Sequence, residues 1–166
     1  MELLGEAGSL GSGTVQVPVG GTHGGWVPPG AAAVPVELGG ETAPTPCWIR
    51  PSSLPNVMES ADGSVTSFAA PAALNGRLES ERDTDRFSFE VEAGKRYVIE
   101  VWARRLRSPL DSVLRLRRDP AKAAVKVNDD AGGGPDSLLE FTAKGGGLVE
   151  VEIADQLGRG GPEYTY

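Results

Sequence analysis

The sequence contains a single cysteine and a single histidine among its 166 residues. One cysteine excludes an internal disulfide and any zinc site built from cysteines. One histidine excludes histidine-rich metal centres and leaves little material for a Ser-His-Asp enzyme. His23 and Cys47 would need an orienting third group to form a nucleophilic pair, and the spacing suggests none. These scarcities favour a protein that is not an enzyme.

Long apolar runs are also missing. No run approaches the roughly 18 residues that a membrane span needs, and the first residues show no basic stretch followed by an apolar run, as a signal peptide would. No capped helical segment of ten residues is recognisable either. We therefore expect no membrane span in this chain and a fold made of strands.

Glycine and proline are abundant, with 23 and 13 residues, and many of them lie in residues 1–53. Short strand-like pieces at residues 14–19, 34–38 and 47–50 alternate there with turns, and prolines confine several of them to sheet edges. So few large apolar side chains would not support an independent core. We expect residues 1–53 to be the tail of a preceding β-domain or a linker arm, and residues 54–166 to form the main domain.

The second segment has the alternation that is typical of strands. Residues 85–92 place Phe87, Phe89 and Val91 on one face. Residues 96–103 follow a turn; a helix competes there, but aromatic and β-branched side chains favour a strand. Further strands are expected at residues 113–117, 124–127, 138–142 and 148–153, the last with Val149, Val151 and Ile153 inward and Glu150 and Glu152 outward. The pattern predicts an all-β fold, an antiparallel β-sandwich of the jelly-roll type.

Charge is strongly segregated along the chain. The net charge is -7, but residues 95–126 carry +7 and the remainder -14. Arg115 and Arg117 alternate with leucines and share one solvent face, so they are candidates for holding an acidic glycan or a neighbouring acidic domain. The alternative is cross-strand pairing with glutamates, namely Glu90, Glu92, Glu150 and Glu152. Without a recognition helix or an aromatic platform, nucleic acid is not an expected partner.

Two other patterns suggest ligands less directly. The glycine runs at residues 132–134 and 145–147 lack a following Lys-Ser/Thr, so we interpret them as hairpin turns and not as phosphate loops. Trp102 lies on the outer face of its expected strand and, with Trp26 and Trp48, could form a sugar-stacking platform. The alternative is that these indoles cover a sheet.

Acidic and amide oxygens recur near the ends of the expected strands. Calcium takes six to eight oxygen ligands, and short acidic motifs such as Asp83-Thr84-Asp85 can supply them. This motif does not belong to an EF-hand loop, because Phe87 occupies the next ligand position and no glycine follows. The alternative is that these residues cap turns by accepting backbone N–H groups. The full set is Glu59, Asp62, Asp83, Asp85, Asn128, Asp129, Asp130, Asp136 and Asp155.

Residues 54–166 resemble a bacterial pre-peptidase C-terminal domain, in the version common in large secreted proteins of planctomycete-like bacteria. The resemblance lies in the order and spacing of short sequence motifs over about 110 residues. These motifs are LPNVME at 54–59, LNGR at 74–77, DTDRFSF at 83–89, AG at 93–94, ARRLRSPLDSVL at 103–114, NDD at 128–130, DS at 136–137 and DQLGRGGPEYTY at 155–166.

The resemblance implies a jelly-roll-like sandwich outside the cell or at its surface, without catalytic activity of its own, attached to proteases and other surface proteins. Some members bind Ca²⁺, which points here to Glu59, Asp62, Asp83 and Asp85 as ligands. The segment at residues 59–62 offers fewer ligands than in those members, because Ser60 and Ala61 occupy positions where further oxygen ligands are frequent. In the family the last strand continues beyond the position of Tyr166, so we expect this chain to stop inside an element.

The sequence as a whole predicts a non-catalytic extracellular accessory or binding module of a larger secreted protein, serving adhesion, targeting or spacing, with Ca²⁺ as the candidate stabilising ion. The expected partners are other domains of the same polypeptide, or an extracellular polysaccharide or protein. The alternative function is a lectin-like module that binds carbohydrate through Trp102, Arg115 and Arg117.

Overall fold

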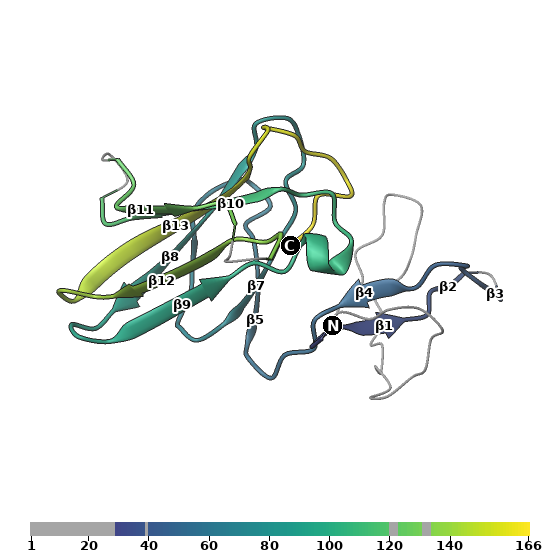
Figure 1. The fold of residues 1–166 in the computed structure, drawn as a ribbon, viewed down its shortest axis with the longest axis horizontal. Helices are drawn as coiled ribbons and strands as arrows, with labels where there is room; N and C mark the ends of the chain where they lie inside the picture. The colour runs from purple at the N-terminus through teal and green to yellow at the C-terminus, as the bar shows by residue number, and fades with distance from the viewer. Residues whose placement is uncertain (1–28, 39, 120–122, 131–133) are drawn as a thin grey trace. The chain divides into compact units, whose positions relative to one another are not determined.

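A computed structural model describes residues 29–38, 40–119, 123–130 and 134–166 (Figure 1). The chain divides into two compact units, Met1–Pro51 and Ser52–Tyr166. None of the helical structure in the described part is long and apolar enough to cross a membrane.

The described part of the first unit consists of short antiparallel pairs. β1 (Ala32–Val34) pairs with β4 (Cys47–Ile49), and β2 (Glu37–Leu38) pairs with β3 (Glu41–Thr42). The strand predicted at residues 34–38 is therefore interrupted after Val34, where Pro35 fixes its own φ and supplies no N–H for a ladder. The predicted strand at residues 14–19 lies outside the described residues.

The second unit contains one larger sheet and several two-stranded pairs (Figure 1). The larger sheet has the strand order β11-β10-β13-β8-β6, and the pairs that complete the unit are β12-β9 and β5-β7. Their bounds are β5 (Asn56–Met58), β6 (Thr66–Ser67), β7 (Ala73–Asn75), β8 (Thr84–Val91), β9 (Arg96–Glu100), β10 (Ser112–Arg117), β11 (Lys126–Asn128), β12 (Leu138–Thr142) and β13 (Gly147–Asp155).

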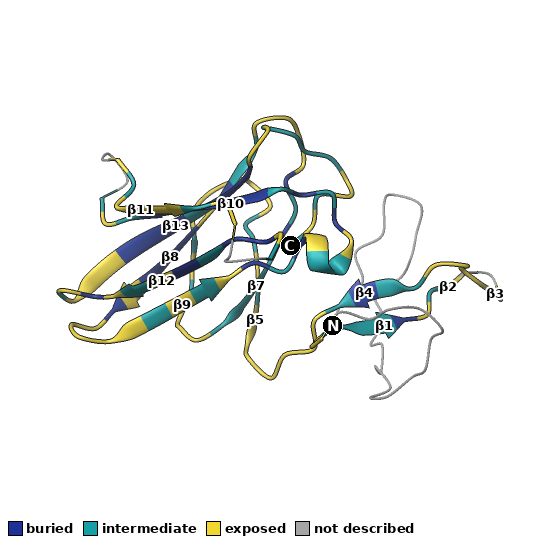
Figure 2. Cartoon of the chain, viewed as in Figure 1, coloured by how far each residue is buried: buried dark blue, intermediate teal, exposed yellow. Residues whose placement is uncertain are grey.

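The core lies between the five-stranded sheet and the β12-β9 pair. Its members include Phe87 and Phe89 from β8, Val149 and Val151 from β13, and Leu139 from β12. These are inward positions of alternating strands, and Figure 2 shows β8, β10 and β13 largely dark blue, as expected for strands that pack against a second layer. The predicted all-β, jelly-roll-like sandwich is confirmed, and so are the predicted inward faces of β8 and β13.

Several details differ from the sequence prediction. Two short pairs, β5-β7 and β6-β8, are parallel. β9 ends at Glu100, where residues to 103 were expected to continue it, and a 3₁₀-helix η1 (Arg104–Leu106) follows soon after. Glu150, expected to point to solvent, is only 6% exposed. It lies on a central strand, and its partners on the two neighbouring strands are Arg117 of β10 and Ser88 of β8.

The last described residues run beside the segment that precedes β8. Leu78 N donates to Tyr164 O at 3.0 Å, and Tyr166 N donates to Gly76 O at 3.0 Å. A bridge between Arg77 and Thr165 completes this antiparallel contact. The pairing brings residue 166 to the beginning of the sandwich, next to the residues that follow β5.

Candidate metal centre

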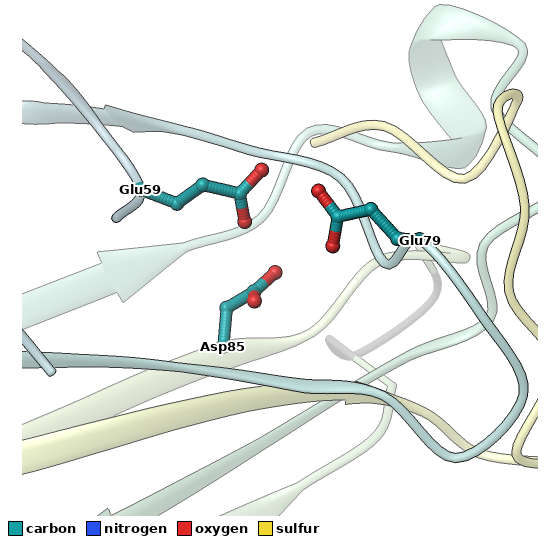
Figure 3. Close-up of side chains that lie close together, drawn as sticks. All are labelled: Glu59, Glu79 and Asp85. Carbon is teal, nitrogen blue, oxygen red and sulfur yellow. The ribbon is translucent and has the colours of Figure 1, made fainter. Parts of the chain in front are cut away.

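Three carboxylates from three segments converge at this end of the sandwich (Figure 3). Glu59 follows β5, Glu79 lies in the connection between β7 and β8, and Asp85 lies in β8. One ligand oxygen from each lies within 4.8 Å of the others. The parallel pairing of β5 with β7 fixes the position of Glu59 in the cluster, and it continues as far as this residue, whose N–H donates to Asn75 O at 2.9 Å. The site therefore depends on strand pairing between segments that are distant in sequence.

Tyr166 closes one side of the cluster. Its hydroxyl donates to Asp85 Oδ2 at 2.7 Å and lies 3.3 Å from Glu59 Oε2. The other oxygen of Glu59 accepts the N–H of Arg77 at 2.8 Å. Tyr166 and Arg77 N–H thus fix the orientation of the two more buried carboxylates.

A glycine makes this close approach possible. A Cβ at Gly76 would overlap the hydroxyl of Tyr166 and would lie 2.7 Å from Glu59 Oε2. Any other residue at this position would displace the tyrosine or the glutamate. Gly76 is therefore part of the site, although it contributes no ligand atom.

The environment of the cluster disfavours the charged forms of its three carboxyl groups, and basic side chains do not offset this. Burial, with the neighbouring Asp85, raises the pKa of Glu59 to about 8. Burial also raises the pKa of Asp85, and burial with a hydrogen bond to Asp83 raises the pKa of Glu79. Within the described residues, no arginine or lysine forms an ion pair with any of the three. Such a set of hard oxygens suits a divalent cation.

The structure unites two of the four predicted calcium ligands. Glu59 and Asp85 belong to the cluster, whereas Asp62 and Asp83 do not belong to the group within 4.8 Å. Asp83 accepts the N–H groups of Glu79 at 2.7 Å and Thr84 at 2.8 Å. Asp62 accepts Ser60 Oγ at 2.7 Å and Ser64 N at 3.0 Å, and these bonds lower its pKa to about 2. These two aspartates match the turn-capping alternative.

Other acidic residues from the predicted set also cap turns. Asp136 is buried and accepts Arg104 N at 2.7 Å and Arg105 Nε at 2.8 Å. Asp155 accepts the N–H groups of Leu157 at 2.9 Å and Arg159 at 3.0 Å. Their carboxylates are already saturated by donors, so they are poor candidates for a cation.

The predicted basic and aromatic ligand residues are not brought together. Arg115 and Arg117, on β10, each donate to Glu152 at 3.0 Å, as the cross-strand alternative predicts. Trp102 follows β9 in the other layer, where its ring lies 3.8 Å from the guanidinium carbon of Arg105. Trp26, which was predicted to form a sugar-stacking platform with Trp102 and Trp48, lies outside the described residues, so that platform stays a prediction.

The sequence interpretation missed Glu79, Gly76 and Tyr166. Glu79 was not singled out, because nothing in its local pattern distinguishes it from other exposed glutamates. Tyr166 reaches the cluster only through the pairing of residues 164–166 with residues 76–78. Gly76 and Tyr166 lie in two of the motifs that carry the family resemblance, but the resemblance did not indicate what either residue does.

The strands and the carboxylate cluster define an all-β sandwich domain with a candidate cation site. No family model and no curated protein matches this sequence. Among solved structures, the pre-peptidase C-terminal domain of collagenase from Bacillus anthracis is similar, with a TM-score of 0.45 and 17% sequence identity. The match covers 55% of this chain and 83% of that domain. At this identity the similarity transfers no function to the present chain.

Proposed function

We propose that the Ser52–Tyr166 unit is a non-catalytic, calcium-stabilised accessory module of a larger secreted protein of the planctomycete type. The observation that carries the proposal is the convergence of Glu59, Glu79 and Asp85 within 4.8 Å. A bound cation would join the residue after β5, the connection before β8 and β8 itself. Its role would be to hold these segments together, which is a structural task and not a chemical one.

The donor set fits calcium better than a softer metal. Three carboxylates offer up to six oxygens, and water completes the six to eight ligands that Ca²⁺ takes. All three residues of the cluster offer carboxylate oxygens, and Cys47, which lies within the described residues, is not among them. Extracellular calcium modules bind with dissociation constants of about 10⁻⁴ to 10⁻³ M. A site of this strength would be filled outside the cell, in agreement with the expected location.

The scarcity of side chains suited to catalysis supports the accessory role. A chain with one histidine and one cysteine has few side chains that act as nucleophile or general base near neutral pH. The order of its short sequence motifs also resembles that of pre-peptidase C-terminal domains. The partners that we propose are the other domains of the same polypeptide or an extracellular polysaccharide or protein.

Calcium is expected to raise the melting temperature of the native chain. At a concentration about 100 times the dissociation constant, a ligand stabilises by about 2.7 kcal/mol, which corresponds to about 5 to 10 °C for a protein of this size. Differential scanning calorimetry in excess calcium and in EDTA measures the shift, and titration calorimetry gives the stoichiometry. We expect one ion per chain.

Two matched variants locate the site. Asp85→Asn should abolish the calcium shift and should melt slightly higher than the native chain in EDTA, because it removes a carboxylate whose charged form burial disfavours yet keeps an acceptor for Tyr166. Asp62→Asn removes the same charge and should keep the shift. Equal melting of the native chain in calcium and EDTA would refute the proposal, as would an Asp85→Asn variant that still responds.

A further inference from the structure

Of the three asparagines in the sequence, only Asn75 precedes a glycine. Such an asparagine is prone to deamidation, because the backbone nitrogen of the next residue can attack its side-chain amide and glycine carries no Cβ to block the approach. The packing also requires glycine at residue 76, since a Cβ there would overlap the hydroxyl of Tyr166. The reactive pair is therefore a consequence of the way in which the chain closes on itself.

The folded chain holds both reacting groups in hydrogen bonds. The nucleophile, Gly76 N, donates to Tyr166 O at 3.2 Å. The side-chain amide of Asn75 is held through Nδ2, which donates to Ala73 O at 3.1 Å and to Asn56 Oδ1 at 3.4 Å. Ring closure needs a free Gly76 nitrogen and an Asn75 amide turned toward it. Both sets of hydrogen bonds must therefore break before the reaction.

Residues 164–166, here called the closing segment, control access to the Gly76 nitrogen. The backbone of this segment exchanges two hydrogen bonds with Gly76 and accepts one from Leu78. The ring of Tyr166 lies edge-on to Phe87, with the ring centroids 6.4 Å apart, and its hydroxyl bonds to the carboxylate cluster. A contact this short opens at a lower free energy than the whole core. Local opening is thus the easiest route to a reactive Gly76.

We propose that Asn75 is a deamidation site whose reaction proceeds only from a state in which the closing segment has opened locally. In that state the Gly76 nitrogen attacks Asn75 Cγ, the bond from Cγ to Nδ2 breaks, and Nδ2 leaves as ammonia with the proton of the attacking nitrogen. Water then opens the succinimide ring at either of its carbonyl groups. The products are aspartate and isoaspartate at residue 75, and the only co-reactant is water.

The isoaspartate product would keep the closing segment from returning. In this product the main chain runs through the side-chain carboxyl group, so an additional methylene group separates β7 from residue 76. The backbone bonds between residues 76–78 and the closing segment depend on this spacing, as does the bond from Arg77 N to Glu59 Oε1. Deamidation would therefore release the closing segment irreversibly and loosen Glu59.

Peptide mass spectrometry of the full chain, incubated at physiological temperature in weakly alkaline buffer, tests the proposal. EDTA in the buffer keeps the result independent of calcium binding. The folded chain should exchange the NH₂ of Asn75 for OH at least about tenfold more slowly than the chain in urea. Asn56 and Asn128, which precede Val57 and Asp129, are internal controls and should react much more slowly in urea than Asn75.

Tyr166→Ala removes the ring and hydroxyl contacts of the closing segment, so it should speed the reaction in the folded chain about tenfold or more. Tyr166→Phe loses only the hydroxyl bond and should give a smaller increase, which keeps the test available if the alanine variant does not fold. Leu139→Ala, in the core strand β12, lowers global stability and is the matched control. Its rate should stay near that of the native chain.

Three results would overturn the proposal. One is a folded native chain that reacts as fast as the chain in urea, because the closing segment would then give no protection. Another is equal acceleration by Leu139→Ala and by the Tyr166 variants, since the reaction would then require global unfolding. The last is an Asn75 that reacts no faster than Asn56 in the unfolded chain.

Discussion

Replacing Gly160 by alanine is expected to lower the free energy of unfolding of the Ser52–Tyr166 unit by about 2 to 3 kcal/mol. A Cβ at this position would overlap the carbonyl oxygen of Ser80 and lie 2.9 Å from its nitrogen. Backbone atoms cannot rotate away as a side chain can. Ser80 is also held in place, because its carbonyl accepts the N–H of Asp83 at 3.2 Å. Two loops would have to separate to admit one methyl group.

Urea unfolding of Gly160→Ala beside Gly145→Ala measures this effect. A Cβ at Gly145, which lies in the connection between β12 and β13 and not in a hairpin because these two strands do not pair with each other, would meet nothing within 4 Å. Alanine there should therefore change stability by less than about 1 kcal/mol. Similar unfolding midpoints for the two variants would show that the loops at residues 79–83 and 158–161 are not packed as described.

The pH dependence of stability should change sign with calcium. In EDTA, Glu59 carries its proton up to about pH 8 in the folded chain, but only up to its ordinary 4.5 in the unfolded chain. Between these values the folded state binds more protons, so the free energy of unfolding falls as pH rises. Because Glu59 is half-buried and screened by solvent, we expect a loss of about 1 to 2 kcal/mol.

With calcium bound, the carboxylates must be ionised, so protons compete with the ion and binding strengthens as pH rises. The free energy of unfolding should then rise over the same window. Urea midpoints at several pH values, in calcium and in EDTA, provide the comparison. Glu59→Gln removes one of the three carboxyl groups with a raised pKa and should make the EDTA profile less steep. An EDTA profile that rises with pH in the native chain, or one that Glu59→Gln leaves unchanged, would contradict this electrostatic account of the cluster.

The sequence predicts the long strands because their information is local. Alternation in β8 and β13 follows directly from which residues face the core, and a period of two is visible without knowledge of the partner strand. β9 was predicted too long for a related reason. Alternation continues to Ala103, but the chain turns into η1, where the distant Asp136 accepts the N–H groups of Arg104 and Arg105.

The candidate site was only half predictable because its information is not local. Glu59 and Asp85 were predicted because the order of the sequence motifs around them resembles that of a known family. Glu79 and Tyr166 join them through the β5-β7 pairing and the contact of residues 164–166 with residues 76–78. No periodicity encodes those pairings. Asp62, near Glu59, and Asp83, near Asp85, were predicted as ligands from the sequence, but each finds its hydrogen-bond donors within a few residues.

The contact between Tyr166 and Glu59 gives the unit a mechanical property. The two residues lie 107 positions apart in the chain, yet the tyrosine hydroxyl is 3.3 Å from a glutamate oxygen. A tension applied between these positions is carried first by this contact and by the backbone pairing beside it, before it reaches the strands of the core. The carboxylate cluster lies beside this contact, so an ion bound there would hold together the segments that a pull on Glu59 and Tyr166 would separate.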